Sequence, residues 1–154
     1  MSDLQGPQPN PTEEMRPFWE GLQRREFLLL RCDLCGAWRW PLAGCREHPN
    51  ASYLENLKWT PGSGRGRVFA FTVQRAQHDP AFPTPYVYAV IELDEGPMMP
   101  STVVNCPSEA VFVGMPVSVV FRPIGREYAV PCFEPVIGAG ASGATAAIAG
   151  SGRR

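Results

Sequence analysis

The sequence has 154 residues, of which 44% are hydrophobic and 19% are charged, enough apolar surface for one globular domain or two small ones. Glycine (15) and proline (17) are so abundant that a helical bundle is excluded and a turn-rich β architecture is favoured. The net charge of −1 argues against capture of nucleic acid or of an anionic membrane by the chain as a whole.

Neither membrane insertion nor export is indicated by the sequence. The longest apolar stretch, 110–121, is interrupted by glycine, proline and serine and is shorter than the roughly 18 residues that a spanning helix needs. The first residues, MSDLQGPQPNPTEE, are polar, proline-rich and acidic, the reverse of a signal peptide. We therefore expect a cytoplasmic protein. Disulfides are rare in that compartment, so an odd count of five cysteines indicates metal binding rather than disulfide bonds.

The first part of the chain is expected to contain a flexible tail over residues 1–13, followed by a short helix and a zinc ribbon over residues 14–55. Thr12 can cap the helix, and acidic residues follow it in the first turn. The helix then has an apolar face at Phe18, Trp19 and Leu22. This face either packs on the chain's own core or docks on another subunit, because aromatic residues are enriched at interface hot spots. The candidate interface anchors are Phe18, Trp19, Trp38 and Trp40.

A cluster of cysteines predicts a metal centre. Cys32 and Cys35 form one pair and Cys45 and His48 a second, each with two residues between its members, as in a pair of zinc knuckles. Gly36 supplies the positive φ that such a knuckle often needs. Four nitrogen and sulfur ligands leave no open position for water, so we expect a structural zinc ion. A redox-active cysteine pair and metal-free structural cysteines are the weaker alternatives, the first because no thioredoxin-like pattern surrounds the pair.

The second part of the chain, residues 56–136, is expected to form a five-stranded OB-fold barrel, because five short strands with turn signals between them suit a small barrel. Residues 51–64 are expected to form a linker, and the Gly/Ala-rich segment 137–154 a disordered tail. The expected strands are 66–76, 86–94, 101–105, 117–121 and 127–136. In the first of them, Phe69, Phe71 and Val73 alternate with Val68, Ala70 and Thr72.

No catalytic relay is evident, because His48 is assigned to the metal and neither Cys106 nor Cys132 has a histidine beside it in the sequence. The basic run 58–75 is either a solvated strand edge or an anion site. In the second case Arg65 and Arg67 flank a glycine on a loop that approaches a phosphate.

Four motifs together carry a resemblance to a known family: PFWEGL before the ribbon, the CxxCG knuckle, the ELDEGP hairpin and the GMPV turn. Over residues 14–136 the chain resembles a bacterial and archaeal family of domains of unknown function. Its members join an N-terminal helix and a rubredoxin-like zinc ribbon to an OB-fold. The family usually has cysteine at the fourth metal position, where this sequence has His48.

The resemblance implies a non-catalytic accessory subunit. Members of the family bind thiolase-like enzymes (lipid-transfer-protein-type thiolases and aldolases) or hotdog-fold hydratases that act on acyl-CoA thioesters, in fatty-acid, steroid side-chain or aromatic degradation. The partner then carries the catalytic groups, and the phosphates of CoA become the candidate ligand of Arg65 and Arg67.

The alternative is a module that binds single-stranded nucleic acid, because zinc ribbons and OB-folds both serve that role. Aromatic residues for base stacking are available on the expected strands, at Phe69, Phe71, Tyr86 and Tyr88. The negative net charge argues against this alternative, because proteins that bind phosphate backbones are usually basic.

Overall fold

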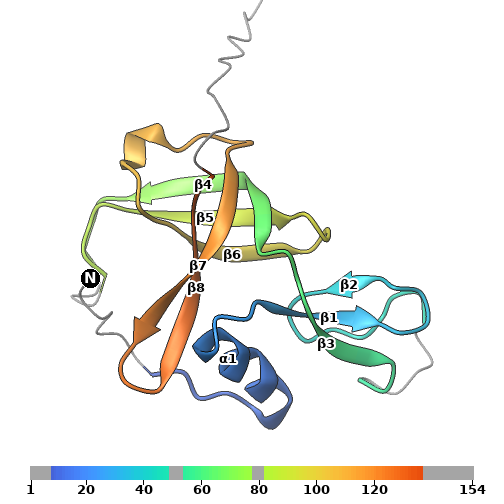
Figure 1. The fold of residues 1–154 in the computed structure, drawn as a ribbon. Coiled ribbons are helices and arrows are strands. Elements are labelled where there is room, and N and C mark those ends of the chain that lie inside the picture. Colours follow the sequence, from blue (N-terminus) through green and yellow to red (C-terminus); the bar gives the residue numbers. More distant parts are fainter. Residues whose placement is uncertain (1–7, 49–53, 78–81, 137–154) are drawn as a thin grey trace, which may run out of the picture.

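The computed structural model describes residues 8–48, 54–77 and 82–136, which form a barrel, a small separate sheet and a short helix (Figure 1). The N-terminal elements are η1 (Glu13–Met15), α1 (Arg16–Gln23), β1 (Leu28–Cys32), β2 (Trp38–Arg39) and β3 (Leu57–Pro61). They are followed by β4 (Arg65–Gln74), β5 (Tyr86–Leu93), β6 (Met98–Val103), η2 (Ser108–Ala110), β7 (Pro116–Ile124) and β8 (Tyr128–Pro135). No helix among the described residues has the length and apolar character that crossing a membrane requires.

Five strands close into a barrel in the order β4-β5-β6-β8-β7, with β7 pairing back onto β4. The pairs are antiparallel apart from β6 and β8, which run parallel and meet at Val103 and Phe133. This closure leaves no free edge on the barrel, which removes the aggregation hazard of an open sheet. The predicted mainly β fold, with a short N-terminal helix, a ribbon and a five-stranded OB barrel, is confirmed.

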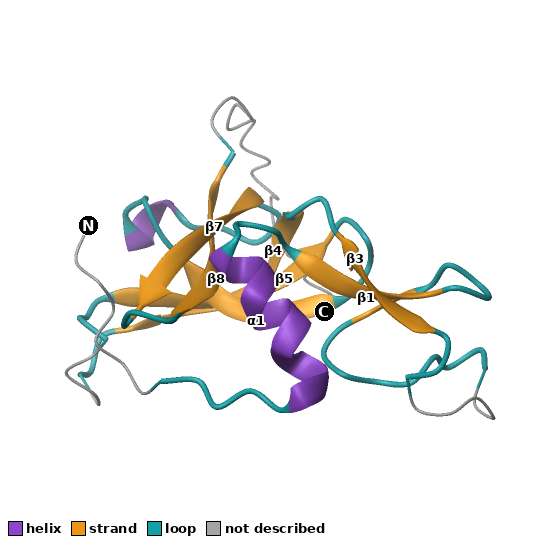
Figure 2. Ribbon diagram, turned by 60° about the horizontal axis from the view of Figure 1, so that its bottom comes forward, coloured by secondary structure: helices purple, strands orange, loops and turns teal. Residues whose placement is uncertain are grey.

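The barrel has an apolar core to which the helix contributes. Val68, Ile91, Val117 and Phe133 are each at most 1% exposed, and burial of such a side chain stabilises a fold by roughly 1.5–3 kcal/mol. Helix α1 lies against β8 and β7, as Figure 2 shows, and places Phe18 and Leu22 in the same core cluster. The first of the two predicted roles for the apolar helix face, packing on the chain's own core, is therefore the one observed for these two side chains.

The helix begins in two steps. A 3₁₀ turn precedes it, and Pro17 stands in the first turn of α1, where its missing N–H costs no intrahelical bond. Thr12 precedes the 3₁₀ turn but makes no side-chain capping bond; its carbonyl oxygen instead accepts a bond from the N–H of Met15 at 3.1 Å. The expected side-chain cap is therefore wrong. Most of the predicted N-terminal tail and all of the predicted tail 137–154 lie outside the described residues.

The ribbon is a three-stranded antiparallel sheet in the order β2-β1-β3. Its third strand lies in the segment predicted to be a linker, and beyond the domain boundary predicted at residue 55. The physical reason is pairing: Leu57 to Pro61 run alongside Cys32 to Leu28 in antiparallel register. The expected linker is therefore wrong at 57–61, and the ribbon extends to residue 61.

Strand β4 departs from the predicted alternation. The register with β5 shifts between Val68 and Ala70, and this bulge leaves Phe69 without a partner. Phe69 is 55% exposed and has no partner, whereas Phe71, itself 36% exposed, and Val73 stand opposite the buried residues Ala89 and Val87. The expected common face of Phe69, Phe71 and Val73 is therefore wrong, because one extra residue reverses the side to which the strand directs its side chains.

Candidate metal centre

The four predicted ligands come from two tight turns of the ribbon. Cys32 ends β1 and Cys35 lies in the turn that follows, where the N–H of Gly36 donates to the carbonyl oxygen of Cys32 at 2.8 Å. Gly36 has φ of +72°, a conformation that glycine adopts without strain. The second turn is closed by the N–H of His48, which donates to the carbonyl oxygen of Cys45 at 3.3 Å.

The ligand atoms gather at distances that suit one tetrahedral ion. All four lie within 4.8 Å of one another. Cys35 Sγ and Cys45 Sγ are 3.5 Å apart, and His48 Nδ1 lies 3.4 Å from Cys45 Sγ and 3.7 Å from Cys32 Sγ. With Zn–S bonds of about 2.3 Å and Zn–N bonds of about 2.0–2.1 Å, tetrahedral geometry places such atoms about 3.5–3.8 Å apart. The four side chains therefore form a metal-site cluster of the predicted composition.

The electrostatic environment shifts the pKa values of two neighbouring thiols in opposite directions. The backbone N–H of Ala37 acts to lower the pKa of Cys35, but desolvation and the neighbouring sulfur atoms outweigh it and the pKa is raised. Desolvation acts to raise the pKa of Cys45, but hydrogen bonds from Cys35 and from backbone N–H groups outweigh it and the pKa is lowered. One thiolate is thus favoured at the expense of its neighbour. A divalent cation bound between the sulfur atoms would stabilise all three thiolates together, so that each could be deprotonated.

The donor set has the composition of a structural metal site. Cys32 and Cys45 are buried, and three sulfur atoms with one imidazole complete a four-coordinate shell. Such a shell has no position at which a substrate or an activated water binds. The residues fit a zinc ion that joins the two turns, and they would supply three thiolates and the neutral His48 Nδ1 as its ligands.

The structure places Arg65 and Arg67 in β4 and not in a loop. Both side chains are exposed, and Arg67 stands opposite Glu92 of β5. Between them, Gly66 is buried so closely against β5 that a Cβ atom would collide with the carbonyl oxygen of Glu92. The interpretation of this glycine as part of a phosphate-binding loop is therefore wrong: its small size is required by the packing of two strands.

The four predicted interface aromatics differ in accessibility. The prediction of Phe18 as an interface anchor is wrong, because this side chain is 2% exposed and its ring lies 4.4 Å from that of Trp40. Trp19, Trp38 and Trp40 are half-buried. Trp19 makes an edge contact with Tyr128 at 5.9 Å, and Arg31 lies over the ring of Trp38 at 5.3 Å. Three of the four aromatics thus keep part of their surface at the outside of the molecule.

Two of these tryptophans line an apolar groove of about 570 Å³. It extends from Trp19 and Trp40 to Tyr86 and Tyr88 on β5, and Arg122 is the cation in its wall. In OB-folds, the face at the second and third barrel strands is the usual ligand face. Here that face is apolar and aromatic, which suits a hydrophobic partner better than a chain of phosphates.

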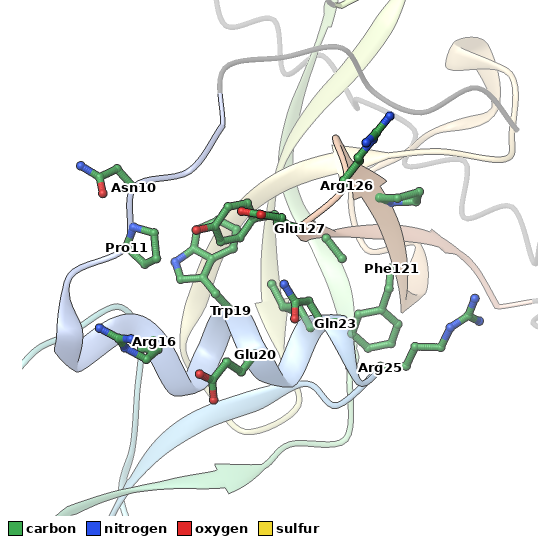
Figure 3. A pocket seen from close by; sticks show the side chains of 14 residues that line it. Asn10, Pro11, Arg16, Trp19, Glu20, Gln23, Arg25, Phe121, Arg126 and Glu127 are labelled. Atoms are coloured by element: carbon green, nitrogen blue, oxygen red, sulfur yellow. The ribbon is translucent and has the colours of Figure 1, made fainter.

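A second, polar cleft of about 870 Å³ lies between α1 and the turn that joins β7 to β8 (Figure 3). Arg16 and Arg25 come from the helix side and Arg126 from the turn, while Trp19 and Phe121 supply apolar walls. Sequence reasoning missed this cleft, because its arginines are separated by up to 110 positions and no local motif connects them.

The remaining described cysteines are not set up for catalysis. Burial raises the pKa of the Cys132 thiol, although the Thr102 hydroxyl, which donates to Cys132 Sγ at 3.2 Å, and Arg122 oppose the shift. Desolvation likewise raises the pKa of Cys106. A raised pKa leaves the thiol protonated at neutral pH, and the thiol is a poor nucleophile. Within the described residues the one histidine is His48 of the metal cluster; His78 lies outside them.

Comparison with known proteins agrees with this architecture. Residues 59–122 match the family described as ChsH2, C-terminal OB-fold domain. A DUF35 domain-containing scaffold protein of Methanocaldococcus jannaschii is 35% identical over 112 residues, which cover 71% of this chain and 77% of that protein. The chain belongs to the DUF35 family.

Two further proteins similar to this DUF35 chain carry names that mention an enzyme. A probable enoyl-CoA hydratase alpha subunit of Thermomonospora curvata is 29% identical over 121 residues; the match covers 78% of this chain but only 37% of the relative. A chain of the solved structure named Ltp2-ChsH2(DUF35) aldolase superposes with a TM-score of 0.73 and 26% identity, over 83% of the DUF35 chain and 98% of its counterpart.

Proposed function

We propose that this DUF35 chain is a non-catalytic accessory subunit that binds and stabilises a thiolase-like or aldolase enzyme acting on acyl-CoA thioesters. The observation that carries the proposal is the similarity to nearly the whole of a chain in the Ltp2-ChsH2(DUF35) aldolase structure. The name of the hydratase alpha subunit supports an acyl-CoA thioester as the substrate class. The name of the archaeal relative supports a scaffold role.

The described side chains support the absence of catalysis by this chain. The histidine and three of the cysteines are gathered in a closed donor set, and burial keeps Cys132 protonated. A nucleophile, a base and a group that orients the base are the minimum for most acyl-transfer chemistry. The partner enzyme then supplies these groups, and the DUF35 chain supplies a rigid surface whose ribbon is fixed by zinc.

The partner is proposed to dock on the apolar groove with Trp19 and Trp40 as anchors, and to reach Trp38 on the adjoining ribbon. Half-buried tryptophans that are already fixed by their own chain lose little entropy on binding, which is why such residues dominate interfaces. Substitution of Tyr88, which is 47% exposed on the groove wall, tests this surface without disturbing the core.

The phosphates of CoA are proposed to contact Arg65 and Arg67. Both guanidinium groups are solvent-accessible on one strand, and neither forms an ion pair within the described part of the chain. The arginine-lined cleft beside α1 is the competing location. Arg65→Ala with Arg67→Ala, compared with Arg25→Ala with Arg126→Ala, separates the two. If the first pair leaves the affinity of the complex for its CoA ester unchanged, the assignment of Arg65 and Arg67 is wrong.

The proposal is tested by co-expression of the tagged full chain with a candidate thiolase-like or aldolase enzyme. We expect the enzyme to co-purify in a fixed ratio, and the acyl-CoA reaction to require the enzyme and not the DUF35 chain alone. Turnover of a thioester by the purified DUF35 chain, or the absence of any complex, contradicts the proposal. The variant Tyr88→Ser should weaken the complex at least tenfold, whereas Phe112→Ser, at an exposed position outside the groove, should not.

Binding of single-stranded nucleic acid is the second candidate function, and the exposure of Phe69 and Tyr88 on neighbouring barrel strands favours it. The net charge of −1 weighs against it. A salt-dependent mobility shift of single-stranded RNA or DNA by the full chain, lost in Phe69→Ser, would favour this function over the first.

A further inference from the structure

Arg39 makes an unusual set of contacts at the edge of the metal cluster. It is the second residue of the two-residue strand β2 and stands opposite Leu30 of β1. Its Nη1 donates to the carbonyl oxygen of Trp38 at 2.9 Å, and its Nη2 donates to Cys45 Sγ at 3.8 Å. Its Nε is buried and has no protein partner, and no described carboxylate lies within ion-pair distance of this side chain.

A guanidinium in this position gains from a counter-charge, because Arg39 is half-buried and its Nε is fully shielded from water. Removal of a cation from water is costly unless an anion compensates for it, and arginine stays protonated at any physiological pH. The carbonyl of Trp38 is neutral, so the group in contact that can carry a negative charge is the sulfur of Cys45. A protonated thiol is a weak acceptor, whereas a metal-bound thiolate is an anion.

The formal charges of the cluster match a single cation. Three thiolates contribute −3, a neutral His48 contributes nothing, and a divalent ion contributes +2, so the centre carries −1. One guanidinium at Cys45 makes the assembly neutral. With a fourth cysteine in place of His48 the same centre would carry −2, and one arginine would no longer balance it.

We propose that Arg39 is the positioning residue that supplies the counter-charge of the metal centre. Its guanidinium, in contact with the sulfur of Cys45, offsets the negative charge that three thiolates leave around a divalent ion and thereby raises the affinity of the ribbon for zinc. The inference rests on the proposed zinc site and is independent of the proposed acyl-CoA partner. Partners of metal ligands usually change metal affinity by about 10–100-fold when they are removed.

Three variants of the full chain test this role. Arg39→Met removes the charge and the donors but keeps most of the side-chain length, and Arg39→Lys restores the charge. The matched control is Arg31→Met, because Arg31 is also a ribbon arginine but contacts Trp38 and the carbonyl oxygen of Gly36, not a sulfur atom. Zinc affinity is measured by competition with a chromophoric chelator. The thiolate-to-metal charge-transfer band is recorded with Co²⁺ in place of zinc.

We expect Arg39→Met to weaken zinc binding by about 10–100-fold and to shift the Co²⁺ band to longer wavelength, because an unpaired thiolate is a better electron donor. Arg39→Lys should recover most of the affinity, and Arg31→Met should change neither quantity. An unchanged affinity in Arg39→Met overturns the inference. Equal losses in Arg39→Met and Arg31→Met also overturn it, because they indicate a general weakening of the ribbon. A wild-type chain that binds neither metal refutes the zinc site itself.

Discussion

The ribbon and the barrel are both built from antiparallel strands, yet different forces hold them together. The barrel closes on itself and encloses a core in which Ile91, Val117 and Phe133 are fully buried. In the ribbon, β1 buries Leu28, Leu29 and Leu30, but β2 has only two residues and the knuckle turns bury chiefly Cys32 and Cys45. A segment with so little apolar burial cannot offset its chain entropy. The barrel is thus held by its hydrophobic core, whereas the knuckle turns gather four potential metal ligands in place of a core.

The largest effect that this difference predicts is the loss of the ribbon without metal. Cys35→Ser should release zinc and unfold residues 30–48 while the barrel stays folded, because structural zinc contributes roughly 10–16 kcal/mol to such folds. The metal content of the purified variant measures the release of zinc. Amide hydrogen exchange, compared between β1 of the ribbon and β5 of the barrel, shows which of the two has unfolded. The control is Cys106→Ser, which changes a barrel cysteine. Full zinc retention in Cys35→Ser, with unchanged exchange, contradicts the assignment.

The second prediction concerns the loss of a core side chain from the barrel. Phe133→Ala should lower the free energy of unfolding by about 3–5 kcal/mol, because it empties a fully buried site at the seam between β6 and β8. Urea unfolding measures this loss. Phe112→Ala, at a side chain that is 48% exposed, should change the free energy by less than about 0.5 kcal/mol. Similar values for both variants would show that the barrel does not depend on this core.

A smaller effect is expected at Gly66 of β4. Gly66→Ala should destabilise the barrel by about 1–3 kcal/mol, because its Cβ would overlap the backbone of Glu92. Thermal unfolding measures this, with Ala70→Ser on the same strand as the control. If Gly66→Ala leaves the stability unchanged but weakens the binding of a CoA ester, the glycine serves a ligand and not strand packing.

The smallest effect is a difference in thiol reactivity. Burial raises the pKa of Cys132, so less of its thiolate is present at pH 8 than for an ordinary thiol. Alkylation of Cys132 should therefore be slow and should accelerate only as the pH rises beyond about 8.5. In chelator-treated protein, Cys35 should be alkylated faster than Cys132, because its thiol is exposed although its pKa is also raised. Time-resolved mass spectrometry after iodoacetamide treatment compares the alkylation rates of Cys35 and Cys132. Equal rates at the two cysteines would contradict the burial of Cys132.

Features set by local pattern were predictable from the sequence. The five barrel strands follow from alternating apolar residues and turn signals, and the ligand set follows from two pairs with equal spacing. Strand β3 was not predicted, although Leu57 to Thr60 alternate between apolar and polar residues, because this short run leads directly into the turn-forming residues after Thr60 and its partner β1 lies far away in the sequence. The bulge at Phe69 was missed for the same reason, since a register shift is a property of two strands together.

By itself, the sequence determined the fold class, the DUF35 resemblance and the identity of the four donors, because each of these depends on residue type and spacing along the chain. Only the tertiary structure decided that Phe18 belongs to the core, that Gly66 is a packing residue and that Arg39 reaches Cys45. Those three outcomes depend on which segments meet in space. Residues that are distant in the sequence contact one another only in the folded chain, so their roles cannot be derived from local sequence patterns.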